Sequence, residues 1–339
     1  MRRTAIRAAA LVACLAVFVS AASASTTAGM GSDMPAAAYQ ALCRQSGACT
    51  YTTGVPTTST AWAGVDGVGG AAIAAKLGGK AVFVPTGIGS IAVVVNLPGK
   101  HGSFVQLRGS TLGKIMAGKV RKWNARAIRQ TNIALRMPQT LITLCAVSRS
   151  SGINLVTSHY LSKVSSDFRT AIGTSASPAW KAPRVVKVAS FADIGGCLEK
   201  HPGGIAFIPF GDALQQGISG DAIMLGWSKP GTAYLQGGVT KPTTVDVFVG
   251  PNDVSAQKAV ATLGSTSGLA DVTASKRPDS YPLTVLIGAA ARLPLTAANA
   301  ATFRSFLSKG AQDDLRSLGY APLPAKLRDA ALARIADAS

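Results

Sequence analysis

Three short segments between Val94 and Gly152 decide the fold of this 339-residue chain: Asn-Leu-Pro-Gly at 96–99, Gly-Lys-Val-Arg-Lys-Trp-Asn at 118–124, and Ser-Arg-Ser-Ser-Gly at 148–152. The third segment lies between an apolar run that predicts a buried strand and an amphipathic run that predicts a helix. Unbonded N–H groups and the positive dipole end at a helix start favour an anion, and an arginine adds a charge-assisted hydrogen bond. The segment therefore predicts an oxyanion site, or alternatively an ordinary helix cap beside a surface arginine.

The rest of the chain alternates between strand and helix patterns, which predicts an α/β architecture. Residues 25–31 read as a small-residue linker. The predicted strands are 50–53, 60–65, 81–85, 90–97, 139–148, 204–209 and 283–287. The predicted helices are 35–43, 71–76, 110–117, 125–130, 153–162, 192–200, 297–307 and 311–318.

Composition limits the class of protein. Hydrophobic residues make up 47% of the chain and charged residues 14%, so a sizeable core is expected and global disorder is not. The formal net charge of +19 favours anionic partners, or reflects a basic bias of a solvated surface. No run of Lys and Arg is interleaved with aromatic residues, so a nucleic-acid module is not expected.

The first 24 residues resemble a secretory signal peptide, with a basic start, an apolar stretch at 8–19 and small residues at 22–24. The apolar stretch is too short to span a bilayer. Cys14 ends a lipoprotein-like box, but it lies early in the apolar stretch, so a lipid anchor is the less favoured alternative. The expected location is periplasmic or secreted.

Four cysteines follow the signal segment: Cys43, Cys49, Cys145 and Cys197. An even number in an exported protein predicts two disulfides, for which three connectivities are possible. The spacings contain no Cys-x-x-Cys and no neighbouring histidine pair, so no metal site is expected.

Signals for catalysis are weak. The histidines at 101, 159 and 201 are isolated, and no His-Glu-x-x-His helix or Gly-x-Ser-x-Gly elbow occurs. A glycine-containing run at 87–92 opens a strand pattern rather than the helix of a dinucleotide loop. We therefore expect no catalytic residues and no cofactor.

The order and spacing of the three opening segments resemble the phosphate-binding proteins of bacterial ABC phosphate transporters, within the periplasmic solute-binding superfamily. The resemblance covers most of the chain after residue 24 and includes segments 202–207, 281–283 and 318–324. It implies a two-lobed periplasmic-binding-protein-like fold of type II, with two α/β domains joined by crossing strands.

The implied division places residues 25–96 plus 281–339 in lobe I and residues 97–280 in lobe II. Each lobe then holds one disulfide, Cys43–Cys49 in lobe I and Cys145–Cys197 in lobe II. A bridge between lobes would hinder hinge motion.

The resemblance also implies the ligand-binding residues. Segment 31–36 matches the family's opening loop, segment 51–58 its second loop, segment 61–66 the loop with a ligand aspartate, and Ser151-Gly152 its fourth loop. The implied set is Asp33, Met34, Thr57, Asp66, Arg149, Ser151 and Gly152.

Several of these positions depart from the family pattern. Asp33 stands where a neutral threonine is expected, and Pro56 and Thr58 stand where glycines are expected. The fourth loop lacks an Asp-Gly pair, so Arg149 is expected to lack an orienting carboxylate. Two roles are possible for Asp33. Its carboxylate either faces the anion beside that of Asp66, or turns outward and caps the helix that begins near residue 35.

The predicted function is an exported, monomeric solute-binding protein that holds inorganic phosphate or a related oxyanion for an ABC permease. Asp66 would accept the proton of hydrogen phosphate, a proton that sulfate lacks. The alternatives are a secreted, non-transport binding protein with a changed or lost ligand, and a secreted phosphate-ester hydrolase.

Overall fold

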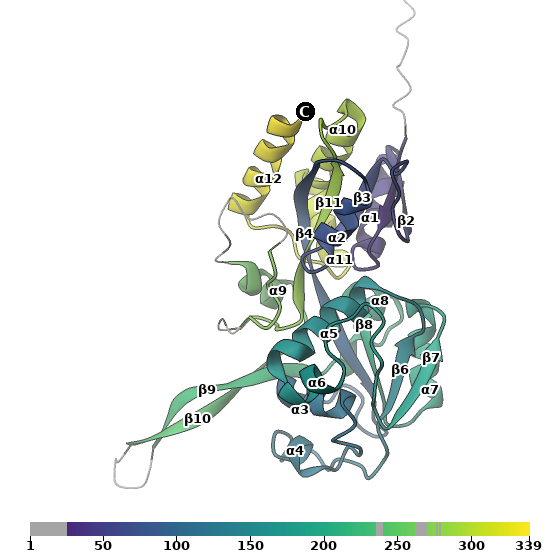
Figure 1. The fold of residues 1–339 in the computed structure, drawn as a ribbon. Coiled ribbons are helices and arrows are strands. Elements are labelled where there is room, and N and C mark those ends of the chain that lie inside the picture. Colours follow the sequence, from purple (N-terminus) through teal and green to yellow (C-terminus); the bar gives the residue numbers. More distant parts are fainter. Residues whose placement is uncertain (1–25, 235–239, 262, 264–269, 276, 278) are drawn as a thin grey trace, which may run out of the picture.

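A computed structural model describes residues 26–234, 240–261, 263, 270–275, 277 and 279–339. The predicted signal peptide and lipoprotein box lie outside these residues. An eight-stranded sheet with the order β2-β1-β3-β11-β4-β8-β6-β7 runs through both lobes (Figure 1). Its strands are β1 (Thr27–Gly31), β2 (Cys49–Thr53), β3 (Trp62–Asp66), β4 (Ala81–Asn96), β6 (Thr143–Val147), β7 (Arg184–Val188), β8 (Gly204–Pro209) and β11 (Thr284–Arg292).

A three-stranded sheet, β10-β9-β5, lies at one side of lobe II (Figure 1). Strands β9 and β10 pair in antiparallel register and project from the body as a long hairpin (Figure 1). The bounds are β5 (Gln106–Arg108), β9 (Met224–Tyr234) and β10 (Thr240–Val249). The side chain of Arg108 donates two hydrogen bonds to the carboxylate of Asp246, at 2.9 and 2.6 Å, and so ties β5 to β10.

Helices pack on both lobes (Figure 1). In lobe I, the upper lobe of Figure 1, they are α1 (Ala36–Ser46), α2 (Gly70–Ala75), α10 (Ala297–Phe306), α11 (Lys309–Ser317) and α12 (Ala325–Ala338). Helix α9 (Asp253–Val260) lies near the junction of the lobes. In lobe II, the lower lobe of Figure 1, they are α3 (Gly109–Met116), α4 (Arg126–Arg129), α5 (Gly152–Val164), α6 (Ser166–Ala171), α7 (Ile194–Lys200) and α8 (Phe210–Gln215), with two short 3-10 helices, η1 (Phe191–Asp193) and η2 (Ser219–Asp221). None of the helices in the described part of the chain has the length and apolar character needed to cross a bilayer.

Strand β4 joins the two lobes. Its first part pairs with β11 and its last six residues, Ile91–Asn96, pair with β8. Two separate strands with a break at Gly87–Gly89 were expected, and that expectation is wrong. The strand continues because β11 pairs along the glycine-containing segment, and a register shift at Ile287/Gly288 absorbs one extra residue.

The expectation of a linker at 25–31 is also wrong, because Thr27–Gly31 forms β1 and pairs in parallel with both β2 and β3. The sequence pattern did not predict this strand because its residues are small. A Cβ atom at Gly29 would lie 2.3 Å from the ring of Trp62, so the close packing of the buried indole requires glycine there. The rings of Tyr39, Tyr51 and Trp62 pack edge-on or stacked beside this strand.

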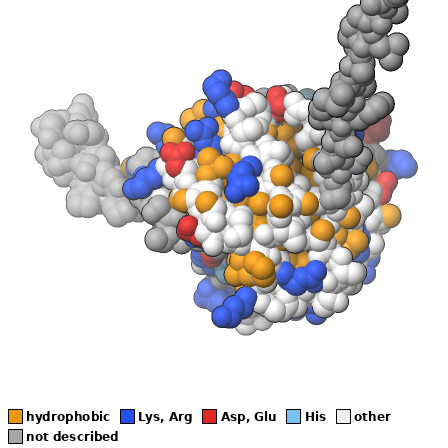
Figure 2. Space-filling view, turned by 90° about the horizontal axis from the view of Figure 1, so that it is seen from above, with side chains coloured by type: hydrophobic (Ala, Val, Ile, Leu, Met, Phe, Trp, Pro, Cys, Tyr) orange, Lys and Arg blue, Asp and Glu red, His pale blue; other side chains and the backbone are white. Residues whose placement is uncertain are grey.

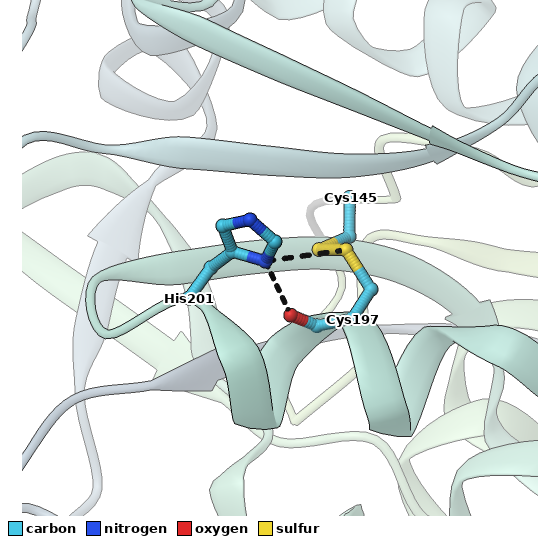
Figure 3. Close-up of side chains that lie close together, drawn as sticks. All are labelled: Cys145, Cys197 and His201. Atoms are coloured by element: carbon cyan, nitrogen blue, oxygen red, sulfur yellow. Dashed lines mark hydrogen bonds between the residues drawn. A yellow bond between two sulfur atoms is a disulfide. The ribbon is translucent and has the colours of Figure 1, made fainter.

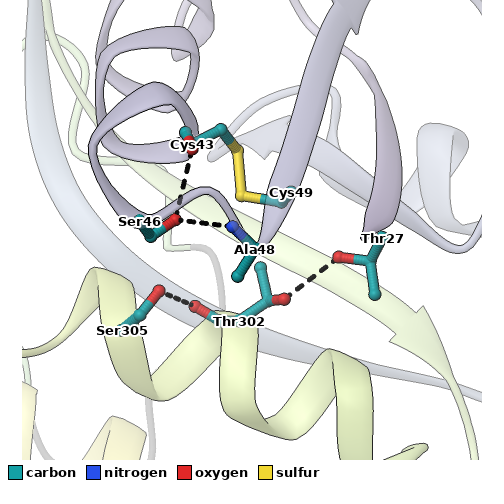
Figure 4. The surroundings of a disulfide bond; sticks show 7 residues. All are labelled: Thr27, Cys43, Ser46, Ala48, Cys49, Thr302 and Ser305. Atoms are coloured by element: carbon teal, nitrogen blue, oxygen red, sulfur yellow. Dashed lines mark hydrogen bonds between the residues drawn. A yellow bond between two sulfur atoms is a disulfide. The ribbon is translucent and has the colours of Figure 1, made fainter. Parts of the chain in front are cut away.

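Both disulfides pair as expected, Cys43–Cys49 and Cys145–Cys197. The first closes the turn between α1 and β2, near the hydrogen bond of 3.0 Å between the hydroxyls of Thr27 and Thr302 (Figure 4). The second ties β6 to α7.

His201 lies beside the second bridge, and its Nδ1 is 2.7 Å from the carbonyl oxygen of Cys197 (Figure 3). This nitrogen and the sulfurs of Cys145 and Cys197 lie within 4.8 Å of one another. Because the two sulfurs are bonded to each other, they do not offer thiolates to a metal ion.

The surface carries scattered basic side chains rather than one block on the face seen from above (Figure 2). Such scatter fits a general attraction for anions and does not outline a nucleic-acid groove on that face.

Candidate functional site

The candidate site lies where strand ends from both lobes meet. Strands β1 and β3 run parallel, and their carboxyl ends carry Ser32, Asp33 and Asp66. In lobe II, β6 ends just before Arg149, and the chain then enters α5. Carboxyl ends of parallel strands are the usual place for a ligand in open α/β sheets. A cavity of about 300 Å³ lies between them and is lined by residues of both lobes.

Asp66 is the most buried polar group of the site, with 0% of its surface exposed. The Ser32 hydroxyl donates to Oδ2 at 2.8 Å, and the backbone N–H groups of Val68 and Gly69 donate to Oδ1 at 3.1 and 2.8 Å. Burial raises the pKa of this carboxyl above its usual value, although the three hydrogen bonds act in the opposite sense. A carboxylate offers about four acceptor positions, and the described residues fill three of those on Asp66.

The start of α5 faces this carboxylate. Ser151 caps the helix, with its Oγ accepting from the N–H of Asn154 at 3.0 Å. The N–H groups of Gly152 and Ile153 have no acceptor within the described residues. A Cβ atom at Gly152 would lie 2.4 Å from the Ser32 hydroxyl and 2.8 Å from Asp66 Oδ2. Glycine thus lets the helix start approach the acidic wall of lobe I.

Asp33 and Arg149 form an ion pair across the cleft. Arg149 donates to both carboxylate oxygens, at 2.8 and 3.2 Å, and its guanidinium carbon lies 6.0 Å from the centre of the Phe191 ring. The expectation that Arg149 lacks an orienting carboxylate is therefore wrong, because Asp33 supplies it from the opposite lobe. The helix-cap alternative for Asp33 is also wrong, since no side chain caps α1.

Two residues of the predicted set lie outside the cavity lining. Thr57 is exposed, and its hydroxyl lies 2.9 Å from that of Ser59. Met34 is fully buried beneath the loop, and its carbonyl oxygen accepts from the Tyr320 hydroxyl at 2.8 Å. The structure brings the other five together: Asp33, Asp66, Arg149, Ser151 and Gly152.

The cavity also has lining residues that sequence reasoning missed. Ser32 had one signal, its place in segment 31–36, which resembles the family's opening loop. Gly54, Val55 and Pro56 lie in segment 51–58 and Ser150 in segment 148–152, both of which the resemblance covers. The lining residues without any signal are mostly apolar: Gly69, Ala72, Ile73, Leu155 and Ala176. Lys76 borders the same cavity.

Two α/β lobes on a shared strand, with strand ends and a helix start facing one cleft, define the solute-binding class of protein. A family model described as a PBP superfamily domain matches residues 58–309. The chain therefore belongs to the PBP superfamily.

Two of the curated relatives are named phosphate-binding protein PstS. The chain is 32% identical over 139 residues to the phosphate-binding protein PstS of Xylella fastidiosa (strain Temecula1), covering 41% of this chain but only 38% of that relative. It is 26% identical over 251 residues to PstS of Haemophilus influenzae, covering 72% of this chain and 69% of that protein.

Solved structures share the fold. A human phosphate binding apolipoprotein is 16% identical with a TM-score of 0.65, covering 91% of this chain and 93% of that one. A phosphate-binding protein from Stenotrophomonas maltophilia has the same identity and coverage with a TM-score of 0.64. These similarities support the two-lobed fold.

Proposed function

We propose that this protein is an exported solute-binding protein that holds phosphate, or a related oxyanion with an acidic proton, between its lobes. It hands the ligand to an ABC permease and does not convert it. The observation that carries this proposal is the buried Asp66 carboxylate facing the unbonded N–H groups at the start of α5.

The start of α5, Asp66 and Arg149 each have a different role in binding. The N–H groups of Gly152 and Ile153 and the positive end of the α5 dipole stabilise ligand oxygens. The Asp66 carboxylate accepts a hydrogen bond from the proton of a protonated oxyanion. A fully ionised anion has no such proton, so the carboxylate repels it. Arg149 has five N–H donors, of which Asp33 uses two, so others can reach the ligand. Closure of the lobes about β4 brings the two halves together.

The comparisons support the proposal. The curated relatives are named phosphate-binding proteins, and a structure of similar fold, with a TM-score of 0.59, is a high affinity periplasmic phosphate-binding protein bound with phosphate. The signal-like residues 1–24 support export, and the division of the chain into lobe I (residues 25–96 plus 281–339) and lobe II (residues 97–280) is part of the same proposal.

The test is calorimetric titration with phosphate of the parent protein and of Gly152→Ala. The added methyl group would collide with Ser32 and Asp66, so phosphate affinity should fall at least tenfold. Gly310→Ala is the matched control, because a Cβ atom there meets nothing within 4 Å, and its affinity should stay within twofold of the parent. A parent protein that does not bind phosphate, or equal affinities for the two variants, would contradict the proposal.

A further inference from the structure

The cavity has more room than an inorganic oxyanion needs. Its volume is about 300 Å³, which is at the lower end of the range of roughly 300–1,000 Å³ for sites that hold organic ligands. A tetrahedral oxyanion has five heavy atoms that are bonded to one another, so it fills less than the roughly 150 Å³ that five separate waters would take at about 30 Å³ each. At least about half of the cavity is left for another part of the ligand.

The spare room adjoins apolar side chains from both lobes. Leu155 follows Ser151 by four residues, so both lie on one face of α5, a turn apart. A Cβ atom at Gly69 would lie 3.2 Å from Leu155 Cδ2 and 3.4 Å from Asp66 Oδ1. The apolar wall therefore begins directly beside the carboxylate that receives the oxyanion.

Helix α2 extends this wall away from Asp66. Ala72 and Ile73 line the cavity from the helix, and Lys76 borders it one turn beyond Ile73. Val55 and Pro56 add apolar surface from the loop after β2. The wall therefore suits a small apolar group attached to the oxyanion.

The charge of the site limits the charge of the ligand. The lining holds two basic residues, Arg149 and Lys76, and two acidic ones, Asp33 and Asp66, so it has no net positive charge to hold a dianion. A monoanion that retains a P–O–H group for Asp66 is favoured, and a monosubstituted phosphorus oxyanion meets this condition as inorganic phosphate does, so the apolar wall is the feature that selects the organic ligand.

We propose that the ligand is an organic phosphorus oxyanion, a phosphonate or a phosphate monoester, with a small apolar substituent packed between α2 and Leu155. This inference rests on the proposed function, because it places the phosphorus group at the same oxyanion site.

The experiment titrates the protein with inorganic phosphate, phenylphosphonate and phenyl phosphate. At least one organic ligand should bind ten times more tightly than inorganic phosphate, and the difference between the two tells a phosphonate site from an ester site. If inorganic phosphate binds as tightly as both, the organic inference fails while the proposed function stands. If none of the three binds, both fail.

A pair of variants on α2 tests where the substituent lies. Ala72→Phe puts a ring into the apolar part of the cavity and should lower the ratio of organic to inorganic phosphate affinity at least tenfold. Its neighbour Ala71 is exposed and does not line the cavity, so Ala71→Phe should leave the ratio within twofold of the parent. Equal ratios for the two variants would overturn the proposed placement.

Discussion

At the scale of single residues, the central feature is that the positive charge of Arg149 is balanced within the protein. Asp33 has a side chain only 5% exposed, whereas that of Arg149 is 42% exposed. Loss of Arg149 would leave a nearly buried carboxylate without its partner, which is costly for folding. An Arg149→Ala variant therefore mixes binding with stability, and Gly152 gives the cleaner test of the site.

The sequence predicted part of this site and not the rest. Arg149, Ser151 and Gly152 were found because a strand end followed by a helix start has a recognisable pattern, whereas Asp66 was implied only by the resemblance of segment 61–66 to a ligand loop of the family. The pairing of Asp33 with Arg149 joins residues 116 positions apart, and no local pattern reports such a contact. Leu155 was missed as a lining residue because an apolar helix position looks the same whether it packs in a core or faces a cavity.

Asp212 on α8 provides a prediction for stability. Burial raises the pKa of this carboxyl to about 6, and the negative charge of Asp33 adds to the effect. The folded state therefore binds more protons than the unfolded state between about pH 4 and 6, and stability falls as the pH rises through that window. Asp212→Asn removes the buried charge and should stabilise the protein by about 1–2 kcal/mol at pH 7 and hardly at all at pH 4.

Urea unfolding of parent and variant at the two pH values measures this difference. Equal changes in the free energy of unfolding at pH 4 and pH 7 would show that the Asp212 carboxyl does not titrate in this window.

At the scale of elements, pattern reasoning located many of the strands and helices, but it gave no element at β7 or at α12. It missed β1, whose residues are small, and divided β4 at its glycines, although both segments pair on the sheet. In each case tertiary packing outweighed the low strand propensity of glycine. The hairpin of β9 and β10 was also missed, because its alternation continues through prolines that usually end a strand.

The two disulfides should differ in what they contribute. The Cys145–Cys197 bridge joins residues 52 positions apart, whereas Cys43–Cys49 joins residues 6 apart. In the chain-entropy model the longer loop gives about 4 kcal/mol and the shorter about 2 kcal/mol. Replacing Cys145 and Cys197 with alanine should therefore lower the free energy of unfolding by about twice as much as replacing Cys43 and Cys49. Denaturant unfolding of the two double variants decides the order, and a larger loss for the short loop would refute the loop-length argument.

At the scale of the whole molecule, two lobes share β4 and enclose the cleft between them. One wall carries the Asp66 carboxylate, and the other carries the N–H groups at the start of α5. An anion is attracted by the second wall and repelled by the first unless it brings a proton. Discrimination between anions therefore requires both lobes, and neither lobe alone forms the site.

The most direct measurement is a calorimetric titration of the parent protein and of Asp66→Asn with phosphate and with sulfate at the same pH. The parent should bind phosphate about a hundredfold more tightly than sulfate, since a charged hydrogen bond and the repulsion it replaces together amount to about 3 kcal/mol. Asp66→Asn should bind phosphate more weakly and sulfate more tightly, because the amide no longer repels an anion without a proton. A parent protein that binds sulfate as tightly as phosphate, or a variant that keeps the hundredfold preference, would contradict the account.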